Sequence, residues 1–266
     1  MRGLRTLPTT AAALMCLQAV LGLSVPGAYR DAGWVRATWF GNDLVTLVVV
    51  VPILVVATAL AQRGSLRGHL LRLGALGYGV YNYAFYMLGA ALNAFFPIYV
   101  VSFVLSAVSL MLLLVVVPAS SVASGFRPAT PVRATGGYLV FVAAGLASVW
   151  LGMWAAHILG GRPTPVEPEA FRLVAALDLA LMVPALASGG VLIWRRRPWG
   201  YVIATVASVQ GALYLTVLST NSVVAISRGL IEAPGELPVW GTLAAATAVA
   251  AITLVVSAEG TTGREV

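Results

Sequence analysis

The sequence predicts an all-α, polytopic membrane protein with about eight transmembrane helices. Hydrophobic residues fill 60% of the 266 positions and charged residues only 9%, and the mean hydropathy is +0.93. An ordinary soluble domain has about 25% charged residues. The apolar runs reach roughly 20 residues each, which is enough to cross a hydrocarbon core about 30 Å thick. These observations exclude an ordinary soluble domain.

Eight apolar runs follow one another along the chain, at residues 8–23, 43–62, 70–93, 97–117, 137–158, 171–194, 200–223 and 239–257. The first run has the form of a signal peptide, with a basic start and a small-residue stretch after it. We expect it to be retained as a helix, because it takes the place in the first half of the chain that residues 137–158 take in the second.

Two stretches of the chain repeat one order of features. Asp43 leads an apolar run that contains Pro52, and Asp178 leads one that contains Pro184; a basic turn and a glycine-bearing segment follow each run. This order predicts a tandem duplication of a four-helix unit, although chance similarity among apolar helices is the alternative. An even number of helices per unit gives two halves in parallel orientation. The predicted parts are a first half at 1–117, a polar cytoplasmic linker at 118–134, a second half at 135–258 and a cytoplasmic tail at 259–266.

All 16 basic residues are arginine, and their placement predicts an orientation. Cytoplasmic loops of membrane proteins collect positive charge. In the eight-helix arrangement one side receives Arg2, Arg5, Arg63, Arg67, Arg72, Arg127, Arg133, Arg195, Arg196, Arg197 and Arg264. We therefore expect a multi-pass protein of the inner or plasma membrane with both termini cytoplasmic. The net charge of +7 is then an orientation signal, and the expected partners are membrane lipids and not nucleic acid.

The two aspartates are the candidate functional residues. A charged aspartate in the centre of a membrane helix costs about 2.5 to 3.5 kcal/mol, and less near the helix end. Counting about 20 residues back from Trp194 places Asp178 roughly 5 Å inside the membrane. The same count from Gln62 places Asp43 at the boundary, where it is either functional or simply a solvated or helix-capping residue.

Polar and aromatic residues on other helices concentrate in the half of the membrane that holds the aspartates. Their positions predict an outward-facing cavity lined by Asn82, Tyr86, Asn93, Trp154, His157, Gln210 and Tyr214. The alternative is that they only join helices, at about 0.6 kcal/mol each on average, or cap and anchor helix ends. Small residues at four-residue spacing, Ala144, Ser148, Gly152 and Ala156, predict a packing seam on the fifth helix.

No established catalytic or cofactor motif is present in the sequence, and a single cysteine and two well-separated histidines predict no metal site and no cofactor. We expect a protein that binds or transports a small, largely apolar molecule, with Asp178 contacting a cationic group or carrying a proton and Asp43 as a weaker counterpart. One alternative is an intramembrane enzyme in which Asp178 and Asp43 are catalytic acid and base in an isomerisation or cyclisation. The other is a non-catalytic accessory or scaffold protein.

Overall fold

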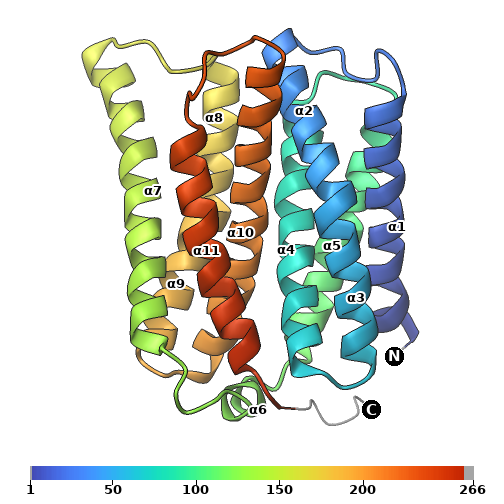
Figure 1. The fold of residues 1–266 in the computed structure, drawn as a ribbon, viewed down its shortest axis with the longest axis vertical. Coiled ribbons are helices and arrows are strands. Elements are labelled where there is room, and N and C mark those ends of the chain that lie inside the picture. The colour runs from blue at the N-terminus through green and yellow to red at the C-terminus, as the bar shows by residue number, and fades with distance from the viewer. Residues whose placement is uncertain (1, 261–266) are drawn as a thin grey trace.

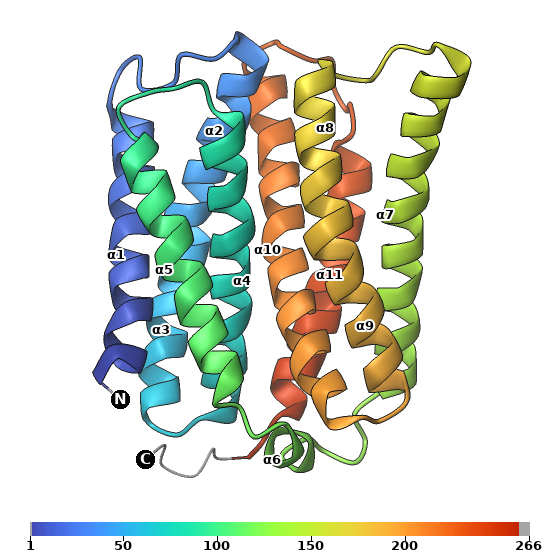
Figure 2. The same ribbon diagram turned by 180° about the vertical axis from the view of Figure 1, so that it is seen from behind.

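The computed structural model describes residues 2–260, and its long elements are all helices (Figures 1 and 2). In chain order the elements are α1 (Arg2–Ser24), α2 (Gly33–Val45), the π-helix η1 (Thr46–Val50), α3 (Val51–Gln62), α4 (Leu66–Gly89), α5 (Phe96–Val115), α6 (Ala119–Ser124), α7 (Val132–Gly160), α8 (Pro168–Leu177), the π-helix η2 (Asp178–Met182), α9 (Val183–Trp194), α10 (Pro198–Ser227) and α11 (Leu237–Ser257). The segments α2–η1–α3 and α8–η2–α9 are each one continuous helix. Residues 2–260 therefore form eight long helices, as the apolar runs predicted.

Seven of these long helices are apolar enough to cross a membrane, so the chain is an all-α polytopic membrane protein. The remaining one, α4, carries Arg67, Arg72 and a series of tyrosines, and most of its length is buried by neighbouring helices. Burial within the bundle explains how a less apolar helix is accommodated, since its polar groups meet protein and not lipid.

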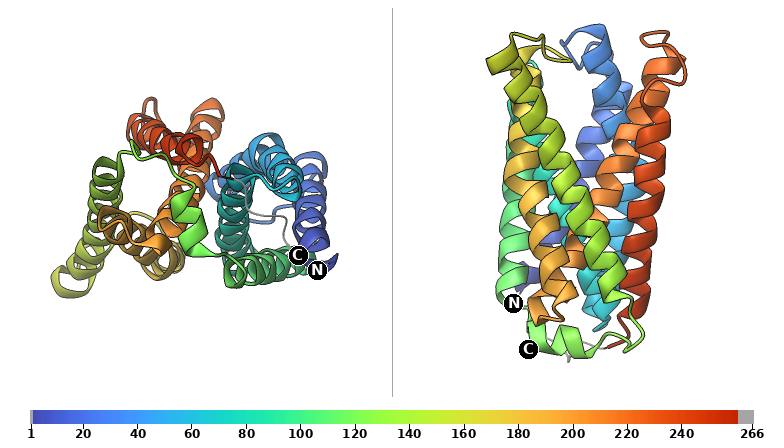
Figure 3. Two further views of the ribbon diagram at one scale, coloured as in Figure 1. Left: turned by 90° about the horizontal axis from the view of Figure 1, so that it is seen from below. Right: turned by 90° about the vertical axis from the view of Figure 1, so that its left-hand side faces the viewer.

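The helices form two groups of four that stand side by side (Figure 3). The helices α1, α2–α3, α4 and α5 make one group, and α7, α8–α9, α10 and α11 make the other. The groups meet where α10 packs against α2 and α4. The short helix α6 lies at one end of the bundle and connects the groups.

The two groups share a numerical register. Residue numbers differ by 132 between η1 and η2, between α3 and α9, and between the first residues of α4 and α10, as in Val51 and Val183 or Leu66 and Pro198. In this register Thr46 is the counterpart of Asp178, and Asp43 lies one helical turn earlier. The two aspartates therefore do not occupy equivalent positions in this register, because Asp43 lies about one turn before the position that corresponds to Asp178. The tandem duplication itself stays a prediction.

Each π-helix ends two residues before a proline, Pro52 in one case and Pro184 in the other. A proline inside a helix has no N–H to donate, and its ring crowds the carbonyl of the residue four positions earlier. The wider turn of a π-helix relieves this crowding, and such turns are frequent at functional sites. The irregular turns thus begin at the buried polar residues Thr46 and Asp178, and Asp43 lies three residues before the first of them.

The predicted packing seam on α7 is wrong. Gly152 has open space where a Cβ would be, and Ala144, Ser148 and Gly152 are exposed. The reason is that α7 lies at the edge of its group and packs mainly on α9. The glycines of α4 do serve as contacts, because a Cβ at Gly74 would overlap Val209 of α10 and a Cβ at Gly79 would meet Ser106 of α5.

One end of the bundle is strongly basic, and we call it the basic end. It contains α6 and the turns after α3 and α9, and it carries Arg63, Arg67, Arg127, Arg133, Arg195, Arg196 and Arg197. Among the described residues Glu259 is the one acid there. The opposite end carries Asp31, Glu167, Glu169, Glu232 and Glu236 beside five arginines. The side chains of Arg2 and Arg5, as well as Arg264 and most of the predicted tail, lie outside the described residues.

Candidate functional site

Asp43 lies in a closed cluster of hydrogen-bond donors. Its side chain is fully buried and accepts from Gln18 Nε2 of α1 at 2.9 Å, from Tyr86 of α4 at 2.7 Å and from the loop residue Tyr29 at 2.5 Å. Gly22 makes room for this contact, because a Cβ there would overlap the carboxyl group. Three donors on one carboxyl group compensate for its removal from water.

The prediction that Asp43 lies at the helix boundary, as a solvated or capping residue, is therefore wrong. The helix begins at Gly33, ten residues earlier, and its N-cap is Ala32. The counting of about 20 residues from Gln62 assumed a helix of minimal length, whereas the continuous helix from Gly33 to Gln62 has 30 residues.

A second layer of aromatic groups surrounds the Asp43 cluster. Tyr83 donates to Gln18 Oε1 at 3.1 Å, and the ring of Tyr86 stacks on Trp39 and Tyr99 at centroid distances of 4.8 and 5.0 Å. Asn93 donates to the Tyr99 hydroxyl at 3.3 Å. Tyr29 lies in the loop after α1, where burial and then the charge of Asp43 raise its pKa and keep its hydroxyl a donor.

Asp178 lies in a smaller cluster that joins the two groups of helices. Its side chain is buried and accepts from the Tyr81 hydroxyl of α4 at 2.7 Å and from Trp150 Nε1 of α7 at 2.8 Å. The Tyr81 ring packs on Tyr214 of α10, with centroids 4.7 Å apart. In the register of 132, Trp150 is the counterpart of Gln18, so the first helix of each group donates to the aspartate of its own group.

A groove adjoins the Asp178 cluster on the side of α7. Its volume is about 490 Å³, and it separates α7 from α8 in the half of the bundle away from the basic end. The walls are largely apolar and aromatic, and the lining residues are Trp150, Leu151, Trp154, His157, Ile158, Thr164, Pro168, Phe171, Arg172, Ala175 and Leu179. The indole of Trp150 thus forms part of the groove wall and also bonds to Asp178.

A third polar feature is a row of amides between the two groups of helices. Asn42 of α2 contacts Asn82 of α4 at 3.2 Å and Asn221 of α10 at 3.1 Å. Close approach of the backbones permits this row, because a Cβ at Gly41 would overlap the side chain of Asn221. Gln210 forms a separate contact, with Nε2 placed 3.1 Å from Met182 Sδ.

The predicted site residues therefore lie in five places and not in one cavity. Tyr86 and Asn93 belong to the Asp43 cluster, Tyr214 adjoins the Asp178 cluster, Asn82 and Gln210 form interhelical contacts, and Trp154 and His157 line the groove. Within residues 2–260, no three His, Cys, Asp or Glu side chains come together as metal ligands would.

The two aspartates share no hydrogen-bond partner. Asp43 bonds to Tyr86 and Asp178 to Tyr81, and five residues along a helix correspond to a rotation of about 140°. The aspartates thus approach α4 from different faces.

Sequence reasoning did not assign Gln18, Tyr29, Tyr81 or Trp150 to the site. The apolar context of Gln18 and the position of Trp150 one turn before Trp154 were the available signals. The position of Tyr29 in a loop gave no signal in the sequence that it belongs to the site.

No protein-family model matches the chain, and no significant match was found among curated proteins or solved structures.

Proposed function

We propose that this membrane protein binds a small, largely apolar molecule in the groove between α7 and α8, which the molecule enters from the lipid phase. The observation that supports this proposal is the double role of Trp150, whose indole lines the groove and holds the buried Asp178. A buried carboxyl group thus lies directly behind one residue of an apolar groove.

The composition of the groove suits a molecule of this kind. Binding sites for small molecules have volumes of about 300 to 1,000 Å³ and are lined mostly by apolar and aromatic groups with a few polar ones. Here Leu151, Phe171 and Leu179 belong to the apolar wall. His157 and Arg172 are the polar groups, near the outer ends of α7 and α8.

Asp178 gives the groove a chemical preference. Rotation of the Trp150 indole would open the carboxyl group to the groove at the cost of one hydrogen bond. A ligand with a cationic or hydrogen-bond-donating group would replace the lost donor, and a plain hydrocarbon would not. The proposed ligand is therefore apolar over most of its surface and carries one such group.

The alternative function, an intramembrane enzyme that uses Asp43 and Asp178 as a catalytic pair, has no comparable support. General acid and base catalysis requires both groups to reach the same substrate within hydrogen-bond distance. Asp43 is enclosed by Gln18, Tyr29 and Tyr86, none of which lines the groove. We assign Asp43 a structural role in joining α1, α2 and α4.

The orientation of the molecule follows from charge. We place the basic end in the cytoplasm, because positive residues collect on that side. In this orientation the groove lies in the outer half of the membrane.

Photocrosslinking tests the groove as a binding place. A benzophenone amino acid at Leu151, in the groove wall, should capture a small molecule from native membranes in addition to bulk phospholipid. The matched control is Val149 on the same helix, which is 51% exposed against 52% for Leu151 but does not line the groove. Identical adducts at both positions would show that the groove has no occupant of its own.

A further inference from the structure

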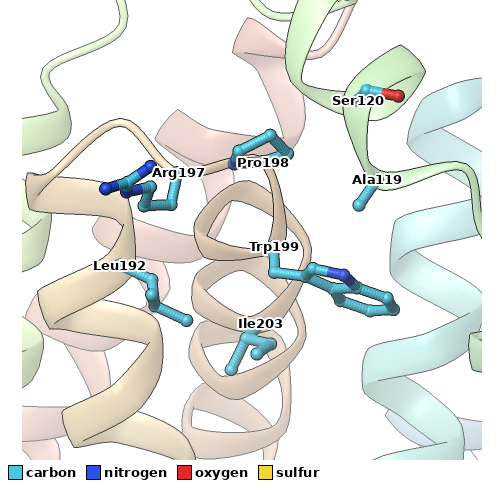
Figure 4. A pocket seen from close by; sticks show the side chains of 7 residues that line it. All are labelled: Ala119, Ser120, Leu192, Arg197, Pro198, Trp199 and Ile203. Atoms are coloured by element: carbon cyan, nitrogen blue, oxygen red, sulfur yellow. The ribbon is translucent and has the colours of Figure 1, made fainter.

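A second and larger cavity lies at the basic end, away from the groove. It has a volume of about 710 Å³ and lies between α6 and the turn that joins α9 to α10 (Figure 4). The lining residues are Ala119, Ser120, Leu192, Arg197, Pro198, Trp199 and Ile203. The indole of Trp199 extends from α10 toward Ala119 of α6, and Leu192 and Ile203 lie deeper along their helices.

The turn that borders this cavity carries positive charge without a matching acid, and its last arginine, Arg197, lines the cavity. Arg195, Arg196 and Arg197 are consecutive and exposed, and none of the three forms an ion pair with a described residue. By contrast, Arg127 bonds to Glu259 and Arg67 donates to the carbonyl of Ala258 at 2.8 Å. Arg197 is also the residue before the N-terminus of α10, where the helix dipole adds to the positive potential.

The interior of the cavity is apolar. Leu192, Ile203 and the indole of Trp199 form its deeper wall, and Trp199 is 43% exposed. Tryptophan at this depth is typical of the headgroup level of a membrane, where its ring contacts both chains and headgroups. The cavity therefore offers a positively charged rim and an apolar floor to a molecule that has a negative head and a hydrocarbon tail.

We propose that this cavity binds an anionic phospholipid. Arg197 would contact the phosphate group, since a guanidinium group matches phosphate oxygens in two parallel hydrogen bonds. The first part of an acyl chain would lie against Leu192, Trp199 and Ile203. Basic pockets between membrane helices on the cytoplasmic side are suited to such headgroups.

The corresponding turn of the first group provides a matched control. Arg63, Gly64 and Ser65 precede α4 as Arg195, Arg196 and Arg197 precede α10, with residue numbers that differ by 132. Gly64 and Arg196 both have positive φ, at 81° and 54°. Neither Arg63 nor Ser65 lines the cavity. Arg63→Gln therefore makes the same change of charge as Arg197→Gln at the same end of the molecule but outside the cavity.

Native mass spectrometry can measure this binding. The full chain is released from nanodiscs that contain equal amounts of phosphatidylglycerol and phosphatidylcholine, and the retained lipids are counted. We expect wild type to retain phosphatidylglycerol selectively and Arg197→Gln to lower this retention about tenfold, the factor that corresponds to the loss of a direct charge-assisted hydrogen bond to the phosphate group. Arg63→Gln should lower it by less than about twofold.

Three outcomes would overturn the proposal. One is equal retention of the two lipids by wild type, and another is an equal effect of Arg197→Gln and Arg63→Gln, which would indicate a general surface charge. The third is displacement of phosphatidylglycerol by millimolar inorganic phosphate, which would show that the cavity recognises the phosphate alone.

A further variant, Arg196→Gly, removes the charge next to Arg197. Glycine suits the positive φ of this position, as Gly64 does in the turn of the first group. Lipid retention by Arg196→Gly should therefore fall less than retention by Arg197→Gln.

Discussion

Trp150 of α7 donates its indole N–H to Asp178 of α8–η2–α9 across 2.8 Å, and the same residue lines the groove between α7 and α8. One bond therefore connects the edge helix, the irregular turn η2 and the proposed binding groove. Tyr81 completes the contact from the other group of helices.

Removal of the Trp150 donor should destabilise the protein. Trp150→Phe keeps an aromatic ring but leaves one oxygen of the buried Asp178 without its donor, which costs about 1 to 3 kcal/mol. Trp154→Phe is the control, since Trp154 is 52% exposed and a surface change of this kind alters stability by less than about 0.5 kcal/mol. The free energy of unfolding in detergent measures both, and equal values would contradict the importance of the bond.

Tyr29 should fasten the loop after α1 to the bundle. Tyr29→Phe removes the donor to Asp43 and the acceptor for Gln18, so we expect a loss of about 1 to 3 kcal/mol and faster amide exchange in residues 25–32. Tyr201→Phe is the matched change, because no hydrogen bond of the Tyr201 hydroxyl to a described residue is observed. Unchanged exchange in Tyr29→Phe would show that the loop is held by other contacts.

Close packing at Gly41 should hold the two groups of helices together. Gly41→Ala would place a methyl group against the side chain of Asn221 and 3.1 Å from its Cα, and overpacking of this kind costs about 1 to 3 kcal/mol. Gly152→Ala on α7 meets open space, and the better helix propensity of alanine should stabilise it by up to about 1 kcal/mol. Thermal unfolding of the two variants should therefore shift in opposite directions, and a stabilising Gly41→Ala would disprove close contact there.

The attachment of the C-terminal end of α11 should depend on pH. The hydrogen bond from Arg127 lowers the pKa of Glu259 below its ordinary value of 4.5. A carboxyl group whose pKa is lowered by folding stabilises the folded state fully above the unfolded pKa, and this contribution is lost as the pH falls through the folded pKa. Protection of the amides of residues 257–260, measured as the exchange rate relative to that of an unstructured chain at the same pH, should thus decrease below about pH 4.5 in wild type, and Arg127→Gln should show low protection already at neutral pH. No difference between the two proteins at neutral pH would exclude a role of this pair.

The helices were largely predictable because each apolar run is long and bounded by polar turns. The start of α2 was not, since Trp34, Arg36 and Trp39 have the composition of a membrane interface yet continue the helix to Gly33. Counting residues gives the minimal length that spans the hydrocarbon core, and a helix can extend well beyond it.

The partners of the aspartates were not predictable in the same way. Asp43 bonds to residues that are 14, 25 and 43 positions away in the chain. The choice among candidate partners depends on the rotation of each helix about its axis, which hydropathy does not determine. Trp154 was predicted as a cavity residue and lines the groove, whereas the residue that bonds to Asp178 is Trp150, one turn earlier.

Native mass spectrometry of protein purified from native membranes tests the proposed groove most directly. Ala175 lines the groove one turn before Asp178, and Ala175→Phe would fill it, whereas Ala144→Phe places the same ring on an exposed position of α7 outside the groove. With both variants shown to be folded by their thermal unfolding, we predict a bound small molecule in wild type and Ala144→Phe that is absent in Ala175→Phe. The same bound mass in all three proteins, or none in wild type, would contradict a binding groove between α7 and α8.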